Sequence, residues 1–194
     1  MLMVALVMGA CYNRHIEPEP LFTAEDFPLK VGNWWRYRLT DDENNTVDTL
    51  LMRVDSVEYT DGESRFYCSF IKNNINERGQ IRKRDSVIYF YPLQYQPITN
   101  FTIGVPCGVD SFFINRVNGV DTVRVLSYEK EYELFGKKYE VFHVKGSMIL
   151  PGYGRGTNDM RISPDIGIIS NDSYFDYMFG YMDIKLELIE YHIE

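Results

Sequence analysis

The chain has 194 residues with 45% hydrophobic and 15% aromatic content, which is enough for one well-packed core but hardly for two. Its formal net charge of -8 argues against a nucleic-acid partner, because phosphate binding requires a basic surface. The basic residues clustered within 78–84 are expected to be the solvated end of a hairpin.

Residues 1–10 carry no charged side chain and end in the small residues Gly9 and Ala10. This composition is typical of the apolar region and cleavage site of an export signal. The segment is too short to span a bilayer, which takes about 20 apolar residues. Since no Lys or Arg precedes the apolar run, either the free amino terminus replaces the usual basic leader or translation starts upstream of Met1. The sequence predicts a signal peptide over 1–10.

Val7 to Cys11, with the sequence VMGAC, resembles a bacterial lipobox in which Met8 replaces the more usual Leu. The resemblance implies that Cys11 is acylated and that the membrane is a partner through this acylated residue. Each buried methylene contributes about 0.8 kcal/mol, so two or more acyl chains give a durable anchor. The alternative is an ordinary buried cysteine. Residues 11–26 contain prolines and charges without an apolar period, which predicts a flexible tether ahead of a single domain at 27–194.

From residue 27 onward, apolar and polar residues alternate between turn signals, which predicts an antiparallel β protein. A change in the parity of this alternation predicts bulges near Asp55 and near Ile189. Asp61-Gly62 and Asn118-Gly119 are hairpin signals. The expected strands cover 35–39, 50–59, 66–70, 80–91, 112–116, 120–126, 139–145, 161–170 and 181–193.

The segments between these strands are expected to be a polar connection at 73–79, an irregular passage at 92–108 and a flexible glycine-rich loop at 152–156. Helices should be few, and 174–180 could hold a short one. Roughly eight to ten strands in sequence order predict an all-β fold, either a strongly curved antiparallel meander or an open barrel, because both hide sheet edges. A two-sheet sandwich is the alternative.

The segment FPLKVGNWWRY at 27–37 is similar to the opening strand of uncharacterised envelope lipoproteins from Bacteroides-type Gram-negative bacteria. The segment ISPDIGII at 162–169 resembles their penultimate strand. The resemblance implies a cell-envelope protein, anchored at the outer membrane, and no particular activity. Gly32 is expected to let the chain bend into the first strand, and Gly167 to let its neighbours pack closely.

Catalytic and metal-binding patterns are scarce in this sequence. His143 and His192 are the histidines beyond the tether, and neither has a second ligand at metal spacing. We therefore predict no catalytic residue, metal or cofactor. A hydrolase would need one of these histidines within hydrogen-bond reach of a carboxylate inside a cleft.

Two further sets of residues are candidates. Cys68 and Cys107 could form a disulfide in an exported protein, or Cys68 could be a buried apolar residue. Tyrosine joins an apolar ring to a polar hydroxyl and suits sugars, peptides or apolar guests, although the same residues could simply fill the core. The candidate ligand contacts are Tyr89, Tyr91, Tyr95, Tyr153, Tyr174, Tyr177 and Tyr181.

Three functions remain open from the sequence. The favoured one is a non-enzymatic, lipid-anchored envelope protein that binds an envelope protein, a glycan or an apolar ligand. The second is a carrier or chaperone of lipids or lipoproteins with an apolar half-barrel. The third is a hydrolase of envelope polymers.

Overall fold

A computed structural model describes residues 27–84, 87–92, 105–106, 111–116, 119–150, 154–177 and 180–194. Every regular element in these ranges is a β-strand. The strands are β1 (Trp34–Asp41), β2 (Thr46–Thr60), β3 (Glu63–Lys72), β4 (Ile75–Arg84), β5 (Val87–Pro92), β6 (Val105–Pro106), β7 (Ser111–Arg116), β8 (Gly119–Leu134), β9 (Lys137–Leu150), β10 (Gly154–Ser163), β11 (Gly167–Tyr177) and β12 (Gly180–His192).

The strands form one antiparallel sheet in the order β6-β5-β4-β3-β2-β1-β12-β11-β10-β9-β8-β7. Each strand from β1 to β6, and from β7 to β12, pairs with its neighbour in sequence, and the two halves join where β1 pairs with β12. The meander predicted from the sequence is therefore confirmed, and the sandwich alternative is wrong because a single sheet carries all the described strands.

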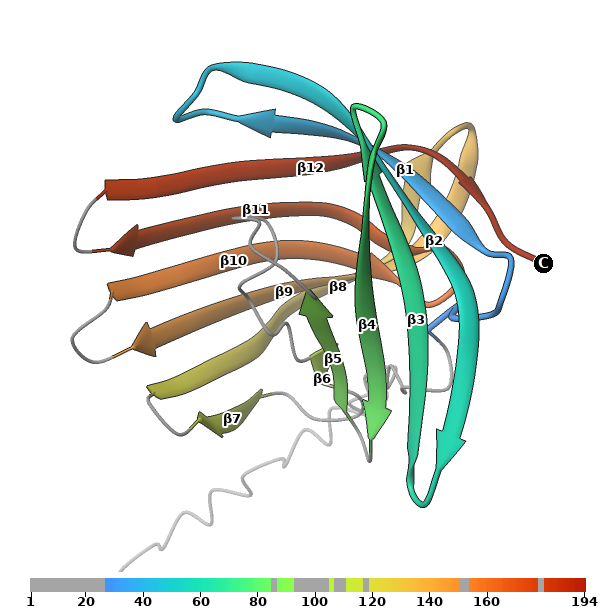
Figure 1. Cartoon of the computed structure of the whole chain (residues 1–194), viewed down its shortest axis with the longest axis horizontal. Helices are drawn as coiled ribbons and strands as arrows, with labels where there is room; N and C mark the ends of the chain where they lie inside the picture. Colours follow the sequence, from blue (N-terminus) through green and yellow to red (C-terminus); the bar gives the residue numbers. More distant parts are fainter. Residues whose placement is uncertain are drawn as a thin grey trace, which may run out of the picture.

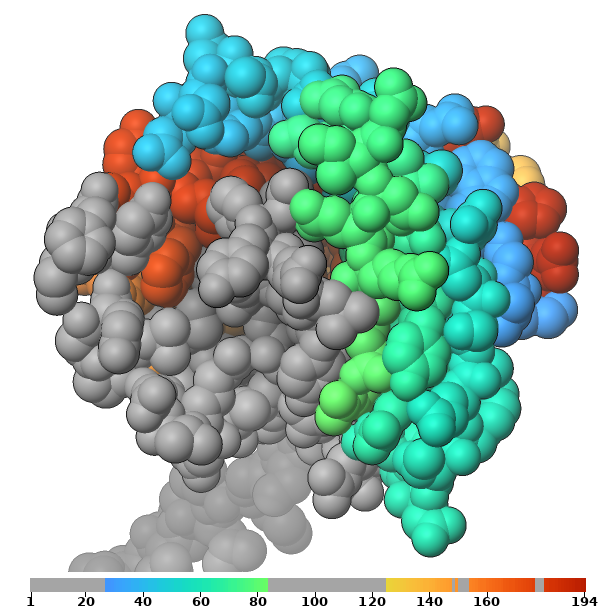
Figure 2. Space-filling view, in the orientation of Figure 1, coloured from blue at the N-terminus to red at the C-terminus, as the bar shows by residue number. Residues whose placement is uncertain are grey.

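The sheet curves so strongly that its two halves face each other. In the view of Figure 1, β2, β3 and β4 run steeply across the flatter β8 to β12. Edge strand β6 comes close to β8, although among the described strands no ladder joins the two edges, so the barrel stays open. Figure 2 shows the outer surface of β1 to β4, coloured blue to green.

Alternation along β1 sets the inner and outer faces of the sheet. Trp35, Tyr37 and Leu39 point inward and are almost fully buried. Between them, Arg36 and Arg38 point outward and pair with glutamates of β12. One contiguous core of buried side chains from β1 to β4 and β9 to β12 fills the space between the halves, as the period-2 pattern requires.

Both predicted bulges are present. The register of β2 against β3 shifts between Val54 and Ser56, which leaves Asp55 as the extra residue. The register of β1 against β12 shifts at Arg36/Tyr37, which leaves Ile189 unpaired. Bulges increase local twist and bend a strand, so these two irregularities help the sheet to curl.

Five sequence expectations about the strands and their connections are wrong. The single strand expected at 161–170 is instead the end of β10, a turn at 164–166 and the start of β11. The 73–79 connection is only a tight turn, because Asn73 and Asn74 adopt positive φ and β4 starts at Ile75. The single strand expected at 80–91 is divided between β4 and β5. The glycine-rich segment expected as a loop enters β10 at Gly154, and 174–177 continue β11 instead of forming a helix. Twelve strands exceed the expected eight to ten.

Trp35 connects the first strand to the connection between β10 and β11. Its indole Nε1 donates to the carbonyl of Ile166 at 2.6 Å, and the Tyr37 hydroxyl donates to Ile168 at 3.1 Å. Gly167 has φ +83°, and a Cβ there would lie 3.2 Å from the indole nitrogen. The predicted close packing around Gly167 is confirmed, because a larger residue would meet the buried ring.

Asn33 organises the entry into β1. Its side chain donates to the carbonyl of Pro28 at 2.8 Å and accepts from the backbone of Glu194 at 3.0 Å. Gly32, at φ +98°, makes the bend expected from the sequence. The backbone N–H of Val54 donates to the Asn33 carbonyl at 2.9 Å, which holds the start of the domain against β2.

Replacing Trp35 by Phe should lower the free energy of unfolding by about 1 to 3 kcal/mol, because the buried carbonyl of Ile166 would lose its donor. Trp34→Phe is the matched control, since Trp34 lies on the outer face beside Arg36 and should change stability by less than about 1 kcal/mol. Urea denaturation measures both variants. Equal losses would contradict the role assigned to Trp35.

Candidate functional site

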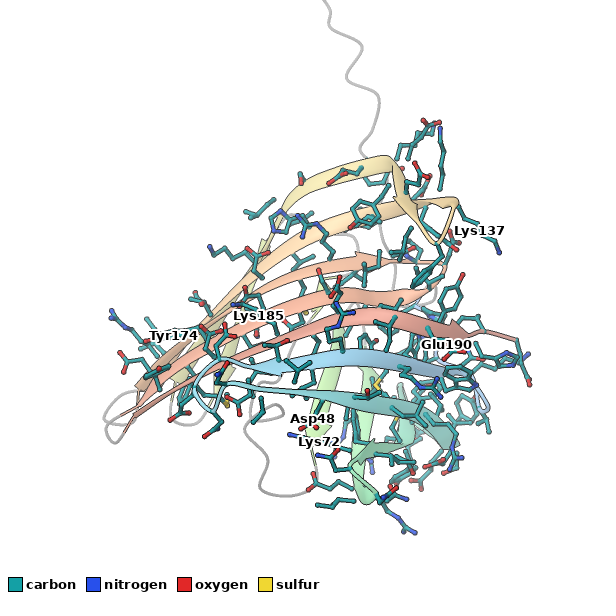
Figure 3. The ribbon with its side chains drawn as sticks, turned by 90° about the horizontal axis from the view of Figure 1, so that it is seen from above. Asp48, Lys72, Lys137, Tyr174, Lys185 and Glu190 are labelled. Atoms are coloured by element: carbon teal, nitrogen blue, oxygen red, sulfur yellow. The ribbon has the colours of Figure 1, made fainter. Side chains whose placement is uncertain are left out.

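The residues on the inner face of the sheet differ between the two ends of the strands. At the end that holds Trp35 and the β10–β11 connection, here called the tryptophan end, the inner face carries large buried residues such as Phe142 and Ile162. At the opposite end, the hairpin end, β1 joins β2, β9 joins β10 and β11 joins β12. In Figure 3, Tyr174 marks the hairpin end and Glu190 marks the tryptophan end.

Three buried polar residues lie on the inner face toward the hairpin end and form what we call the inner polar chain. Asn171 Nδ2 donates to Ser173 Oγ at 2.8 Å, and Ser173 Oγ donates to Asn158 Oδ1 at 2.6 Å. Asn158 and Ser173 are direct cross-strand partners on β10 and β11. The inner polar chain is electrically neutral, because its three side chains present only amide and hydroxyl groups.

The inner polar chain ends in an acceptor without a partner. Asn171 Oδ1 is buried and receives no hydrogen bond. Its cross-strand neighbours are Met160 on β10 and Leu186 on β12, both apolar. A buried acceptor that lacks a donor is unusual, since most buried polar groups are paired.

Two glycines adjoin Asn158. Gly146 lies directly opposite on β9, and Gly156 precedes it by two residues on the same face of β10. Both are buried. Glycine in a strand interior has no side chain to pack and often marks a place where a ligand or another backbone approaches closely.

An ion pair also lies toward the hairpin end. Lys72 Nζ is 3.2 Å from Asp48 Oδ2, and Asn73 Nδ2 donates to Asp48 Oδ1 at 3.0 Å (Figure 3). These hydrogen bonds, first from Asn73 and then from Lys72, lower the pKa of the Asp48 carboxyl below its usual value. The pair ties the β3–β4 turn to β2.

The outer face carries a row of charges across β9 to β12. His143 Nε2 lies 2.6 Å from Asp159 Oδ1, so a histidine within hydrogen-bond reach of a carboxylate, one of the two conditions for a hydrolase, is present.

Partial burial, and then Asp183 and Asp159, raise the pKa of the Asp172 carboxyl on the outer face, although Lys185 opposes them. No group of three or more metal-ligating side chains lies close enough to hold an ion within the residues that the structure describes.

Ser127 of β8 lies directly opposite His143 in the ladder with β9. A serine, a histidine and an aspartate therefore occupy three adjacent strands of the outer face. The imidazole of His143 presents Nε2 to the Asp159 carboxylate. The serine–histidine–aspartate template instead uses Nδ1 for the carboxylate and Nε2 for the serine. The arrangement offers a weak base near a hydroxyl without the template's orientation.

The predicted ligand tyrosines are only partly described. Tyr174 and Tyr181 stack on the outer face of β11 and β12, with ring centroids 6.2 Å apart. Both are exposed, so they do not line the inner face. Tyr89, Tyr91 and Tyr177 lie in strands but their side chains fall outside the description, and Tyr95, Tyr153 and Cys11 lie outside the described residues.

Cys68 is a free thiol on the inner face of β3. Burial, and then the charge of Asp55, raise the pKa of the thiol to about 12. This does not support the predicted disulfide and agrees with the alternative of a buried apolar residue; Cys107 lies outside the described residues.

Comparisons with known proteins find two solved structures of low similarity. No family model and no curated protein matches the chain. The chain is similar to a crystal structure of an inferred lipoprotein from Parabacteroides distasonis, with 13% identity, a TM-score of 0.46, and coverage of 89% of this chain and 99% of the other. It is also similar to an inferred exported protein with a YmcC-like fold from Bacteroides fragilis, with 11% identity, a TM-score of 0.47, and coverage of 89% and 100%.

Within the described ranges, no helix is long and apolar enough to cross a membrane. The sequence analysis does not predict the inner polar chain, because it expects a loop at 152–156 and places no strand over Asn158. The available signal was a polar residue in the same parity as Met160 and Ile162, which is anomalous at a core position.

Cys68 should resist modification in the folded protein. In a chain carrying Cys11→Ala and Cys107→Ala, Cys68 is the remaining cysteine. Ellman's reagent at pH 8 should label it only after denaturation, because burial shields the thiol and little of it is ionised. Rapid labelling of the native protein would contradict this. A mass gain of the exported wild-type chain on reduction would instead reveal the Cys68–Cys107 bond.

Proposed function

We propose that this protein is a lipid-anchored protein of the Gram-negative cell envelope with a binding rather than an enzymatic role. The observation that carries the proposal is the position of Cys11, at the border between an uncharged apolar segment and a polar one, in a lipobox-like sequence. Acylation of this residue would hold at a membrane a chain whose described part is an all-β domain.

The concave side of the sheet supports the binding role. It combines apolar side chains with a short, neutral, hydrogen-bonded chain of polar residues. Binding sites for small molecules are typically apolar with a few placed polar groups. A carrier of lipids or lipoproteins is the second form of this role, because an open, curved sheet offers an apolar inner face.

The anchor can be tested by growing cells with an alkyne-tagged fatty acid. The wild-type chain should carry the tag and fractionate with membranes, whereas Cys11→Ala should lose both properties because the acceptor sulfur is gone. Cys107→Ala is the matched control and should behave as the wild type. If Cys11→Ala keeps the tag and the membrane fraction, the proposed anchor is wrong.

The hydrolase remains as a competing function because Ser127, His143 and Asp159 occupy neighbouring outer strands. We expect the purified protein to hydrolyse p-nitrophenyl butyrate no faster than Ser127→Ala or His143→Ala. The reversed orientation of the imidazole is the physical reason. Wild-type hydrolysis about a hundredfold faster than both variants would favour the hydrolase instead.

A further inference from the structure

The turn between β8 and β9 contains an unusual residue. Phe135 has φ +51°, and Gly136 after it has φ +72°. Asparagine and glycine are the usual residues at two such positions of a tight hairpin turn. The other non-glycine residues with positive φ in the described part of the chain are all asparagines, namely Asn45, Asn73 and Asn74. A phenylalanine is strained in this conformation, because its Cβ crowds the backbone.

The ring of Phe135 is 50% exposed. It lies tilted against Tyr191, with ring centroids 6.0 Å apart. This contact leaves half of the ring in water, so packing alone does not explain why a strained position holds an aromatic residue. Strained positions that a fold retains are often functional ones.

The turn projects beyond the neighbouring strand. β9 pairs with β10 only from Phe142 onward, whereas its ladder with β8 continues to Lys137. Residues 134–138, here called the phenylalanine tip, therefore stand clear of β10. Figure 3 places Lys137 on the same side of the molecule as Glu190 and far from Tyr174, so the tip lies at the tryptophan end. A tip that projects in this way can meet a flat surface.

The charges of the phenylalanine tip suit a lipid surface. Lys138 Nζ pairs with Glu131 at 2.8 Å. Lys137 is exposed and has no ion-pair partner among the described residues. An aromatic ring beside a lysine fits the membrane–water interface, because the ring enters between the lipids while the amine meets their phosphates. The net charge of -8 opposes a broad attraction to anionic lipid, so such a contact is confined to the tip.

The start of the domain lies at the same end as the phenylalanine tip. A Cβ at Gly167 would lie 3.6 Å from Pro28 Cγ and 3.2 Å from the Trp35 indole nitrogen, so Pro28 is beside Trp35. Tyr191, which contacts Phe135, is the ladder partner of Trp35. The chain therefore enters the domain near the tip.

An anchor at Cys11 would bring this end of the domain to the membrane. The tether predicted at 11–26 spans roughly 20 Å as a flexible chain. The 14 residues of β9 alone span roughly 45 Å. Because the tether is shorter than the molecule, the end that it enters stays closest to the bilayer.

We propose that the phenylalanine tip inserts into the interface of the membrane that carries the anchor, with Phe135 between the lipid head groups and Lys137 at an anionic phosphate. The insertion rests on the anchor proposed above and adds a second contact to it. Two contacts hold a protein at a membrane more durably than one and fix the orientation of the domain.

Co-sedimentation with vesicles of phosphatidylethanolamine and phosphatidylglycerol tests the insertion in the full-length chain carrying Cys11→Ala. Phe135→Asn should lower the partition coefficient about fivefold, because half a ring loses its burial in lipid. This variant should fold, since asparagine tolerates positive φ. Ile149→Asn is the matched control, because Ile149 is 61% exposed near the opposite end of β9, and it should leave the coefficient unchanged.

Lys137→Gln should lower the partition coefficient about fivefold on the same vesicles, because one lysine at an anionic surface is lost. On vesicles of pure phosphatidylcholine it should change nothing, whereas Phe135→Asn should weaken binding to both. An equal effect of Lys137→Gln on both vesicles would overturn the phosphate contact.

The orientation is tested by coupling Cys11 of a Cys107→Ala chain to a maleimide-bearing lipid in the vesicles, since Cys68 is buried. Phe135→Trp should add emission that lies at shorter wavelength and is quenched by brominated lipid. Ile149→Trp should add emission that is neither shifted nor quenched. Equal quenching of the two variants would overturn the orientation.

An unchanged partition coefficient in Phe135→Asn would overturn membrane insertion and leave a protein as the partner of the exposed ring. Neither vesicle experiment requires a cell to acylate Cys11. Fatty-acid labelling of Cys11 is a separate measurement, so failure of the anchor and failure of the tip are distinguishable.

Discussion

The hydrogen bond from the Trp35 indole to the carbonyl of Ile166 is the contact on which the packing of the tryptophan end depends. It joins the first strand of the sheet to the start of β11, two strands away across β12. Because the indole is fully buried, the bond forms in a region of low dielectric, where a missing partner is costly. Gly167 allows this approach, because a Cβ there would lie 3.2 Å from the indole nitrogen.

That constraint also explains why the two ends of the inner face differ. Large rings and branched side chains gather around Trp35, where β1, β11 and β12 converge. Further along the same strands, the inward positions hold Gly156, Asn158 and Ser173 instead. Toward the hairpin end, buried polar residues and glycines are packed among apolar side chains such as Phe175, Met182 and Ile184.

Much of this fold could be predicted from the sequence, because alternation and turn chemistry are local. The inward Trp35-Tyr37-Leu39 set, the bulge at Asp55 and the bend at Gly32 all follow from short patterns. The strand at Gly154 could not be recognised, since a glycine-rich stretch has low strand preference by itself and is held by pairing with β9 and β11.

The candidate site was harder to predict than the fold. Asn158 is brought to Ser173 and Asn171 by the pairing of β10 with β11, and no local pattern links positions that are more than ten residues apart. The outer pair of His143 and Asp159 was likewise hidden, because it depends on the register between β9 and β10. Only the buried, free state of Cys68 matched an alternative already visible in its strand.

Pairing of β1 with β12 has a consequence for folding. Trp34 faces His192, so the ladder that unites the two halves links residues from opposite ends of the domain. Contacts of such long sequence separation carry a large loop-closure entropy and slow the folding of β proteins. A chain emerging from the ribosome cannot complete this sheet until its last strand has been made.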